Sequence, residues 1–311
     1  MSDFVRQQHT VCDFSSSDSW VILSPIEQSI KRKIEAVGTP LKDWDINIYR
    51  GVLTGCNEAF IISTEKRDEI LSNCKTEEER TRTAELIRPI LRGRDIKRYG
   101  YDWANLWLIY LPWHFPYQFD DSIQGASEKA EKAFMEQYPS VYAHMLQYKE
   151  PLSKRNKAET GIRYEWYAMQ RWGAKYWEDF YKPKIMYPNM TKFMPFYYDE
   201  KKFFQNDKSF MITGSHTAFL TAFLNSSIFK FCFIDNFPEL LGGTRELRKI
   251  FFDKIPVKKI SDKINEEFIG LINDIQKEYT IEKAIHIDER LFELYNLSEE
   301  EKRTIGFIDI K

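Results

Sequence analysis

A stretch with two glycines four positions apart, residues 48–62, constrains the fold more than any other part of this 311-residue chain. Gly51 and Gly55 permit backbone angles that residues with a side chain avoid. Thr54 and Asn57 carry short polar side chains that bond to neighbouring backbone in turns, and the apolar residues that end the stretch favour a strand. We therefore predict a tight turn that leads into a short buried strand. The amides of this turn either meet a phosphate or serve the fold alone.

Residues 80–98 form a strongly basic segment, with seven Lys or Arg and two Asp or Glu. Such a run either contacts the backbone of a nucleic acid or forms a solvated face of the protein. Arg92, Arg94 and Lys97 lie around Gly93, which predicts a turn, and we take these three cations as candidate DNA contacts. Because the glycine breaks regular spacing, the sequence does not fix whether the three side chains share a face.

Basic and aromatic residues alternate from residue 149 to residue 184. Arginine and lysine bind phosphates and base edges, while aromatic rings pack or insert between bases, so this mixture is typical of nucleic-acid interfaces. The candidate DNA contacts of this stretch are Lys154, Arg155, Arg163, Arg171 and Lys184. Five acidic residues interrupt it, and the alternative is that most of its aromatic side chains belong to the core.

The net charge of −2 conceals a difference between the C-terminal segment and the rest of the chain. Residues 261–311 carry 7 basic and 13 acidic side chains, a balance of −6, whereas residues 1–260 carry 38 and 34, a balance of +4. The 23 Phe, 17 Tyr and 8 Trp indicate a folded protein. No apolar stretch reaches the roughly 20 residues of a membrane span, so no membrane partner is predicted. The four cysteines lack metal-site spacing, which favours reduced thiols in a cytoplasmic protein.

The apolar pattern predicts an α+β fold, a mixed sheet with flanking helices followed by a small helical unit. Ser24, Pro25 and Glu27 predict a capped helix that ends at Gly38. Further helices are predicted over residues 64–86, over 128–156 with a break at Pro139, and over 215–234 with a break near residue 225; strands are predicted at 106–113 and, as a meander, at 184–187, 193–198 and 210–213. We divide the chain into a lead-in over residues 1–23, a domain over 24–258, and an acidic helical unit over 259–311.

In their order and spacing these segments resemble the TaqI-like C-terminal specificity domain. This is the target-recognition part of adenine-specific DNA methyltransferases and of fused type II (type IIG) restriction-modification enzymes. Besides the two glycine turns, the resemblance rests on short matches at residues 152–155, 166, 170–171, 180–185, 224–226, 242–248, 251–256, 287–288, 294–297 and 299–301. It implies that the chain contacts double-stranded DNA. It adds Arg245 and Arg248 of the basic turn at 242–248 to the candidate contacts, together with Thr54 and Asn57.

The catalytic signatures of those enzymes are absent from this sequence. It has no Pro-Pro pair, and hence no Asn/Asp-Pro-Pro-Tyr/Phe loop for the target adenine, and no Pro-Asp dipeptide of a nuclease centre. We therefore predict no catalytic, cofactor-binding or metal-binding residues in this chain, although its sequence alone does not decide whether it is an enzyme. The resemblance implies S-adenosylmethionine, and Mg where a nuclease is fused, in a methyltransferase or methyltransferase-nuclease domain that acts with this chain.

The expected function is to give sequence specificity to N6-adenine methylation, and to cleavage where the enzyme contains a nuclease. Two alternatives remain open at this point. The chain is a protein-interaction scaffold in a phage-defence complex, or it is a fragment that contributes to a catalytic site with unfamiliar residues.

Overall fold

The computed structural model describes residues 23–308, which divide into two compact units. Unit 1 contains residues 23–46 and 218–308, and unit 2 contains residues 47–217. This division differs from the predicted one, in which residues 24–258 form one domain. Segments 24–46 and 218–258 belong to unit 1 because their helices pack on the C-terminal helices. Of the predicted lead-in, only Leu23 lies among the described residues.

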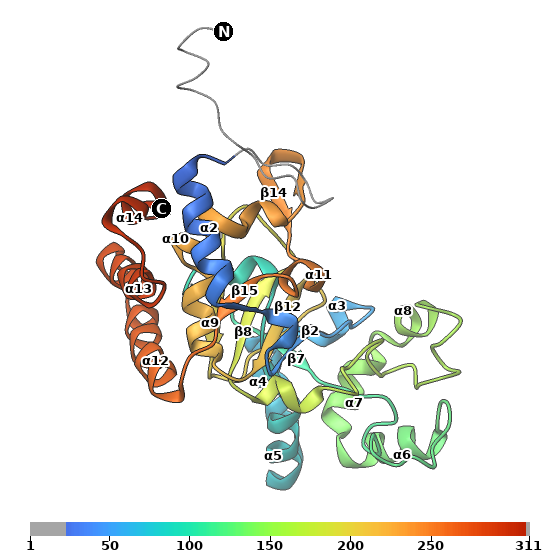
Figure 1. The fold of residues 1–311 in the computed structure, drawn as a ribbon. Coiled ribbons are helices and arrows are strands. Elements are labelled where there is room, and N and C mark those ends of the chain that lie inside the picture. The colour runs from blue at the N-terminus through green and yellow to red at the C-terminus, as the bar shows by residue number, and fades with distance from the viewer. Residues whose placement is uncertain (1–22, 309–311) are drawn as a thin grey trace, which may run out of the picture. The chain divides into compact units, whose positions relative to one another are not determined.

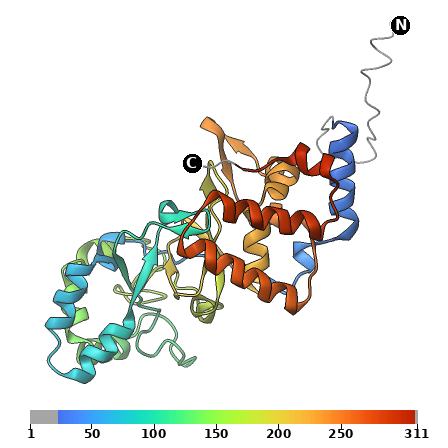
Figure 2. The same ribbon diagram turned by 90° about the vertical axis from the view of Figure 1, so that its left-hand side faces the viewer.

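Unit 1 is mainly helical (Figure 1). Its helices are α2 (Pro25–Val37), α9 (Thr217–Leu224), α10 (Ser227–Phe233), α11 (Lys249–Phe252), α12 (Asp262–Lys277), α13 (Ile281–Leu294) and α14 (Glu299–Ile305). The strands β1 (Gly38–Pro40) and β15 (Pro256–Lys258) pair antiparallel, and β13 (Glu239–Leu240) pairs with β14 (Thr244–Glu246). Figure 2 shows α12 and α13 side by side, in red.

The predicted cap of the first helix is confirmed. The Ser24 hydroxyl accepts from the Glu27 amide, and the Glu27 carboxylate accepts from the Ser24 amide at 2.6 Å. Ile30 and Ile34 of α2 are fully buried. Two further α2 residues, Ser29 and Lys33, donate to the Glu301 carboxylate of α14 at 2.9 and 2.7 Å, so α2 is bonded to α14.

Unit 2 contains two four-stranded sheets. One has the order β10-β8-β12-β2, and the other has the order β11-β4-β7-β3. The strands are β2 (Ile46–Arg50), β3 (Ile61–Ser63), β4 (Ile87–Leu91), β5 (Ile96–Lys97), β6 (Gly100–Tyr101), β7 (Leu106–Ile109), β8 (Lys184–Pro188), β9 (Met190–Thr191), β10 (Tyr197–Asp199), β11 (Phe204–Gln205) and β12 (Ser209–Gly214). The three predicted strands after residue 184 form, but not as a meander, because β8 lies between β10 and β12.

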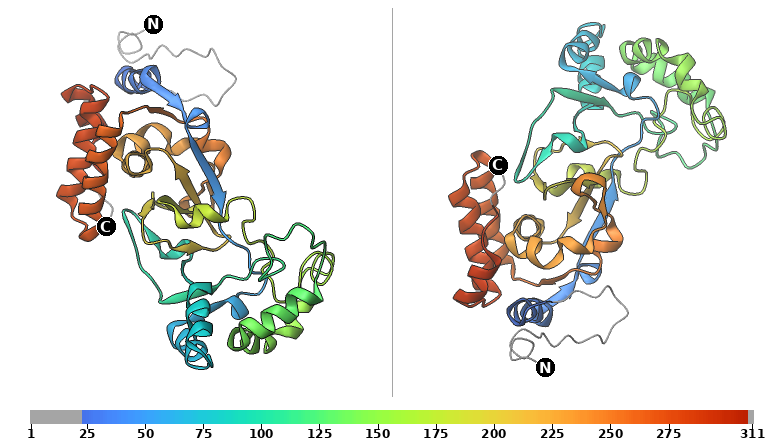
Figure 3. Two further views of the ribbon diagram at one scale, coloured as in Figure 1. Left: turned by 90° about the horizontal axis from the view of Figure 1, so that it is seen from below. Right: turned by 90° about the horizontal axis from the view of Figure 1, so that it is seen from above.

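The helices of unit 2 are α3 (Asn57–Phe60), α4 (Thr64–Ser72), α5 (Glu77–Leu86), α6 (Glu128–Gln137), α7 (Pro139–Leu146) and α8 (Lys149–Lys154). They follow the predicted segments except for α3, a single helical turn between the first glycine turn and β3 where the strand was expected to begin; of the predicted strand, Ile61 and Ile62 form β3 and Phe60 belongs to α3. Pro139 begins α7, as its fixed backbone angle and missing amide favour. Helix α7 packs on α4 and α6, and Figure 3 shows the green α6–α7 pair beside the light blue helices.

The core of unit 2 is rich in aromatic side chains. Tyr164, Trp166, Tyr167 and Trp172 are all buried, which confirms the alternative that most aromatic residues of the aromatic-basic stretch serve the core. The sheets and helices together confirm the predicted α+β class. Among residues 23–308 no single helix has the length and hydropathy of a membrane span; α9 and residues 227–236 pass that test only together, as a pair bent by 65°.

Candidate nucleic-acid interface

The first glycine turn of unit 2 packs against the turn that precedes β12. The Gly51 amide donates to the Ser209 carbonyl oxygen at 3.0 Å, and the Val52 amide donates to the Gln205 carbonyl oxygen at 2.9 Å. A Cβ at position 51 would stand 2.1 Å from the Asn206 carbonyl oxygen. Glycine is therefore required here, because neighbouring backbone occupies the space that a side chain needs.

The second glycine turn contacts the same residues. A Cβ at Gly93 would lie 2.9 Å from the Lys208 carbonyl oxygen. Within this turn, Arg92 donates to the Asp95 carboxylate through Nε at 2.9 Å and Nη2 at 2.8 Å, and these bonds raise the pKa of Arg92. Residues 206–208 therefore join the two turns that the sequence singled out separately.

Six exposed cations lie on these turns or on segments bonded to them, and we call them the basic turn cluster: Arg50, Arg94, Lys97, Arg171, Lys175 and Lys208. Arg50 and Lys208 both pair with Asp207, at 3.5 and 3.4 Å, and Lys97 pairs with Asp102 at 3.5 Å. The other three cations form no ion pair within residues 23–308. Exposed ion pairs at such distances are weak and screened by salt, so the cluster keeps positive charge for an anionic partner.

Arg171 joins the first turn through its backbone. The amides of Leu53 and Arg171 each donate to the carbonyl oxygen of the other residue at 2.9 Å. Close by, the Tyr176 hydroxyl donates to the Arg50 carbonyl oxygen at 3.1 Å, and the Tyr176 ring stacks on Tyr49 at 4.3 Å. Burial raises the pKa of Tyr176. These contacts hold the Arg171 backbone, and hence its Cα and Cβ, next to the first glycine turn.

Thr54 and Asn57, both predicted as DNA contacts, occupy different environments. Thr54 is buried, and its hydroxyl donates to the Asn57 side-chain oxygen at 2.7 Å. Asn57 is exposed at the start of α3. The geometry gives Thr54 a role within the turn and leaves Asn57 accessible, so a DNA contact by Asn57 remains a prediction.

Arg155 was predicted to contact DNA, and the structure places its guanidinium inside the fold instead. It donates to the carbonyl oxygens of Leu152 at 3.1 Å and Trp166 at 2.9 Å, and also to those of Thr54 and Ala168. Burial lowers the pKa of Arg155. Because these bonds use its donors within unit 2, Arg155 supports the first glycine turn and has no free edge for a base.

Lys184 is a second correction. It is fully buried in β8, where its ammonium donates to the Asp199 carboxylate at 2.6 Å and to the Phe180 carbonyl oxygen at 2.8 Å. Burial lowers the pKa of Lys184. A side chain without solvent exposure does not reach DNA. The prediction was wrong because the sequence does not distinguish a buried lysine from an exposed one.

Lys154 and Arg163 are exposed, as a DNA contact requires, but each has an acidic neighbour. Lys154 pairs with Glu150, and Arg163 pairs with Glu159 at 3.0 Å. Their contact with DNA remains a prediction.

Of the two candidate arginines of unit 1, Arg245 is bound within the fold and Arg248 is exposed. Arg245 donates to the carbonyl oxygens of Ile234 at 3.2 Å and Phe237 at 2.7 Å, and it pairs with two carboxylates. Those bonds occupy the guanidinium, which corrects its prediction as a DNA contact. Arg248 is exposed and pairs with Glu246 at 2.8 Å, so its contact with DNA remains a prediction.

Three members of the basic turn cluster were absent from the predicted contacts. Arg50 directly precedes Gly51, Lys175 lies in the aromatic-basic stretch, and Lys208 lies in a polar turn between two strands. A search for cations next to each glycine turn would have found Arg50, whereas Lys208 becomes visible only through the fold. Within residues 23–308, no group of three or more His, Cys, Asp or Glu side chains is arranged to hold a metal ion.

Comparison with known proteins identifies a family. The model of the TaqI-like C-terminal specificity domain matches residues 88–257, which is more than half of the chain. The type II methyltransferase M.MjaIV of Methanocaldococcus jannaschii is 20% identical over 239 residues, covering 72% of this chain and 69% of that protein.

Two solved enzymes are similar in structure. The type IIL restriction-modification enzyme MmeI, solved in complex with DNA, has a TM-score of 0.53 at 12% identity and covers 86% of this chain. The type IIG restriction endonuclease BpuSI has a TM-score of 0.47 at 15% identity and covers 81%. The matched parts are 35% of MmeI and 28% of BpuSI, so this chain spans about a third of either enzyme. The family match, with a fold like part of MmeI, confirms the resemblance noted in the sequence: the chain belongs to the TaqI-like C-terminal specificity domains, the target-recognition domains of restriction-modification enzymes.

Proposed function

We propose that this chain selects the DNA sequence on which an N6-adenine methyltransferase, or a methyltransferase fused to an endonuclease, acts. The observation that carries the proposal is the basic turn cluster, in which residues 206–208 join two glycine turns with exposed cations around them. Positive charge gathered on adjoining turns of one unit is the electrostatic requirement for binding a duplex.

The cations of the cluster divide into two roles in this proposal. Arg94, Lys97 and Lys208 bind phosphates and so set the position of the duplex. Arg171 reads a base, because its backbone is fixed by Leu53 and its planar guanidinium pairs with O6 and N7 of guanine in the major groove. Phosphate contacts carry affinity, and the arginine–guanine pair carries specificity.

Methyl transfer itself belongs to a catalytic domain in this proposal. That domain binds S-adenosylmethionine, and Mg where it includes a nuclease, since this sequence lacks the Pro-Pro loop that holds the target adenine. The task of this chain is to hold the duplex so that one adenine leaves the stack toward the catalytic domain. The cytoplasm is the compartment in which we place this activity.

The proposal is tested by selecting bound sequences from a random duplex pool with the full chain fused to its catalytic domain. We expect one enriched motif. Arg171→Gln should relax the base preference at one base pair, whereas Arg94→Gln should lower the affinity for all sequences by about the same factor. Lys277→Gln, an exposed cation of α12, is the matched control and should change neither property.

The two alternatives make different predictions in the same system. A protein-interaction scaffold shows no enriched motif, no DNA affinity and salt-insensitive protein contacts. A chain that completes an unfamiliar catalytic site transfers labelled methyl groups from S-adenosylmethionine to DNA without the catalytic domain. Either result replaces the proposed function.

A further inference from the structure

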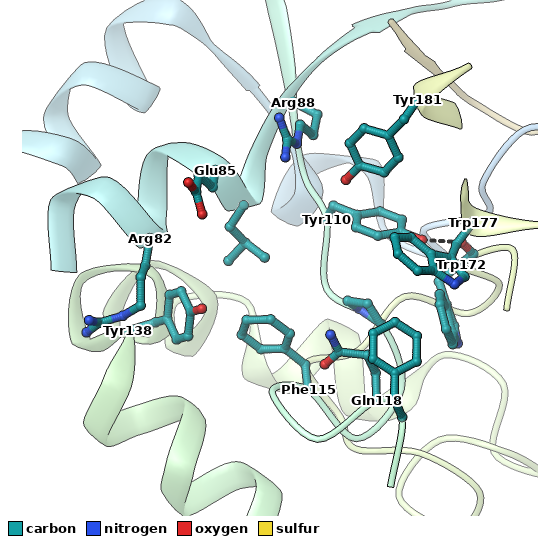
Figure 4. A pocket seen from close by; sticks show the side chains of 13 residues that line it. Arg82, Glu85, Arg88, Tyr110, Phe115, Gln118, Tyr138, Trp172, Trp177 and Tyr181 are labelled. Carbon is teal, nitrogen blue, oxygen red and sulfur yellow. Dashed lines mark hydrogen bonds between the residues drawn. The ribbon is translucent and has the colours of Figure 1, made fainter. Parts of the chain in front are cut away.

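Unit 2 contains a pocket of about 210 Å³ whose walls are mostly aromatic (Figure 4). Its lining residues are Arg82, Glu85, Leu86, Arg88, Tyr110, Pro112, Phe115, Gln118, Phe119, Tyr138, Trp172, Trp177 and Tyr181. None of them belongs to the basic turn cluster, so the proposed reading of duplex DNA does not use this pocket.

The aromatic walls are fixed in place by contacts with one another. The Tyr110 hydroxyl donates to the Trp172 carbonyl oxygen at 2.7 Å, which is the dashed line in Figure 4. Phe119 lies 5.2 Å from Trp177 and 6.5 Å from Trp172, measured between ring centroids. Yet the Phe119 side chain is 60% exposed. An exposed phenylalanine beside two tryptophans gives a flat ligand a surface to stack on.

Two polar atoms of the lining are buried without a hydrogen bond to any other described residue: Nε of Arg88 and Oε1 of Gln118. One is a donor and the other is an acceptor. Buried polar atoms of this kind are costly unless a partner meets them. Figure 4 shows Arg88 and Gln118 on opposite sides of the pocket, with the Tyr181 hydroxyl directed inward near Arg88.

The charged side chains of the lining are Arg82, Arg88 and the carboxylate of Glu85, a balance of one positive charge. Arg82 is already engaged, since it donates to the Gln137 carbonyl oxygen at 3.1 Å and lies over the Tyr138 ring. Arg88 lies over the Tyr181 ring at 5.1 Å and forms no ion pair within residues 23–308. Arg88 is thus the cation that remains for a ligand inside the pocket.

We infer that this pocket binds an unpaired guanine base. Guanine presents the acceptors O6 and N7 on one edge and the amino donor N2 on another. A donor at Arg88 and an acceptor at Gln118, on opposite sides of a pocket lined by aromatic rings, match these two edges. Stacking on Phe119 and the tryptophans holds the plane of the base, as in sites that read unstacked bases.

The base has two possible sources with the same chemistry, a free guanine nucleotide or an unpaired guanine in DNA. The first arm of the test titrates the full chain with dGMP, dAMP, dCMP and deoxyribose 5-phosphate by calorimetry. We expect saturable binding of dGMP at least tenfold tighter than that of the other three. Phe119→Ala and Arg88→Gln should each weaken dGMP about tenfold to a hundredfold.

Matched controls separate binding from folding. Phe193→Ala removes another phenylalanine that is 60% exposed, and Arg80→Gln removes an exposed arginine of α5; neither residue lines the pocket, and neither variant should change dGMP binding. Phe119→Ala removes a largely exposed ring, so its thermal unfolding should match that of the parent chain.

The second arm compares a duplex that carries one extrahelical guanine with the same duplex fully paired. DNA is the source of the base if the chain binds the duplex with the extrahelical guanine more tightly and if Phe119→Ala loses this preference but still binds the paired duplex. The free nucleotide is the source if the chain binds dGMP but shows no preference between the two duplexes. Equal affinity for all four small molecules, or no effect of Phe119→Ala and Arg88→Gln, overturns the inference. If the parent chain does not bind the paired duplex at all, that result would instead count against the proposed function.

Discussion

Gly51 lies so close to Asn206 that a Cβ at position 51 would stand 2.1 Å from the Asn206 carbonyl oxygen. This approach brings the first glycine turn onto residues 206–208, which the second glycine turn also contacts. The basic turn cluster depends on it, because Arg50 directly precedes the glycine.

Replacing Gly51 with alanine should therefore destabilise the protein. The obstacle is backbone and not a flexible side chain, so we expect a loss of about 2–3 kcal/mol in the free energy of unfolding. Gly100→Ala is the control, since nothing lies within 4 Å of a Cβ there. Urea denaturation of both variants measures the difference, and equal stability would show that the two turns separate easily.

Arg155 should prove to be a structural residue. Arg155→Met leaves four carbonyl oxygens without their donor, and we expect it to cost about 2–4 kcal/mol in the free energy of unfolding. Lys154→Met, at the exposed neighbouring position, should cost less than about 0.5 kcal/mol. If Arg155→Met instead unfolds like the parent chain and changes base preference, the residue reads DNA after all.

The buried pair of Lys184 and Asp199 should show strong coupling. Lys184→Met leaves the Asp199 charge without its ammonium partner, which we expect to cost about 3–5 kcal/mol. Asp199→Asn should cost less in the Lys184→Met background than in the parent chain, because in the parent chain it leaves a buried lysine ammonium without its carboxylate and the double variant has no such charge. Additive losses in a double-mutant cycle would contradict a direct interaction.

Stability should fall in acid through Glu301. Burial raises the pKa of this carboxyl, but hydrogen bonds from Lys33, Ser298 and Ser29 outweigh that effect and bring the pKa to about 2. The ionised form is thus favoured by folding. Its contribution is present above the ordinary glutamate pKa, near 4.5, and is lost as the pH falls toward 2.

The size of this effect follows from the pKa difference. About 2–3 kcal/mol of the free energy of unfolding should disappear between roughly pH 5 and pH 2. Glu301→Gln should remove that part of the pH dependence, and Glu300→Gln, which is exposed, should retain it. Identical pH profiles for Glu301→Gln and the parent chain would exclude Glu301 as the source.

The sequence predicted features that depend on neighbouring residues. The Ser24 cap, the helix break at Pro139 and the break near residue 225 follow from local backbone chemistry, and each is present. The family could also be predicted from the sequence, because the short matches keep the family's order along the chain.

Features that depend on distant contacts were not accessible. Arg155 and Arg171 stand in the same aromatic-basic stretch, yet one is enclosed by carbonyl oxygens and the other is exposed. The place of β8 between β10 and β12 and the assignment of α2 to the C-terminal helices are set by packing across the chain. Spacing alone carries no information on either.

The most direct test of the central claim is the salt dependence of duplex binding by the full chain. In a log–log plot of affinity against salt, each phosphate contact contributes about 0.9 to the slope. The variant Arg94→Gln/Lys97→Gln/Lys208→Gln should bind more weakly and have a slope smaller by about 2–3, whereas Lys263→Gln/Lys277→Gln, two exposed cations of α12, should keep the parent slope. An unchanged slope in the triple variant would contradict the assignment of the basic turn cluster as the DNA-binding surface.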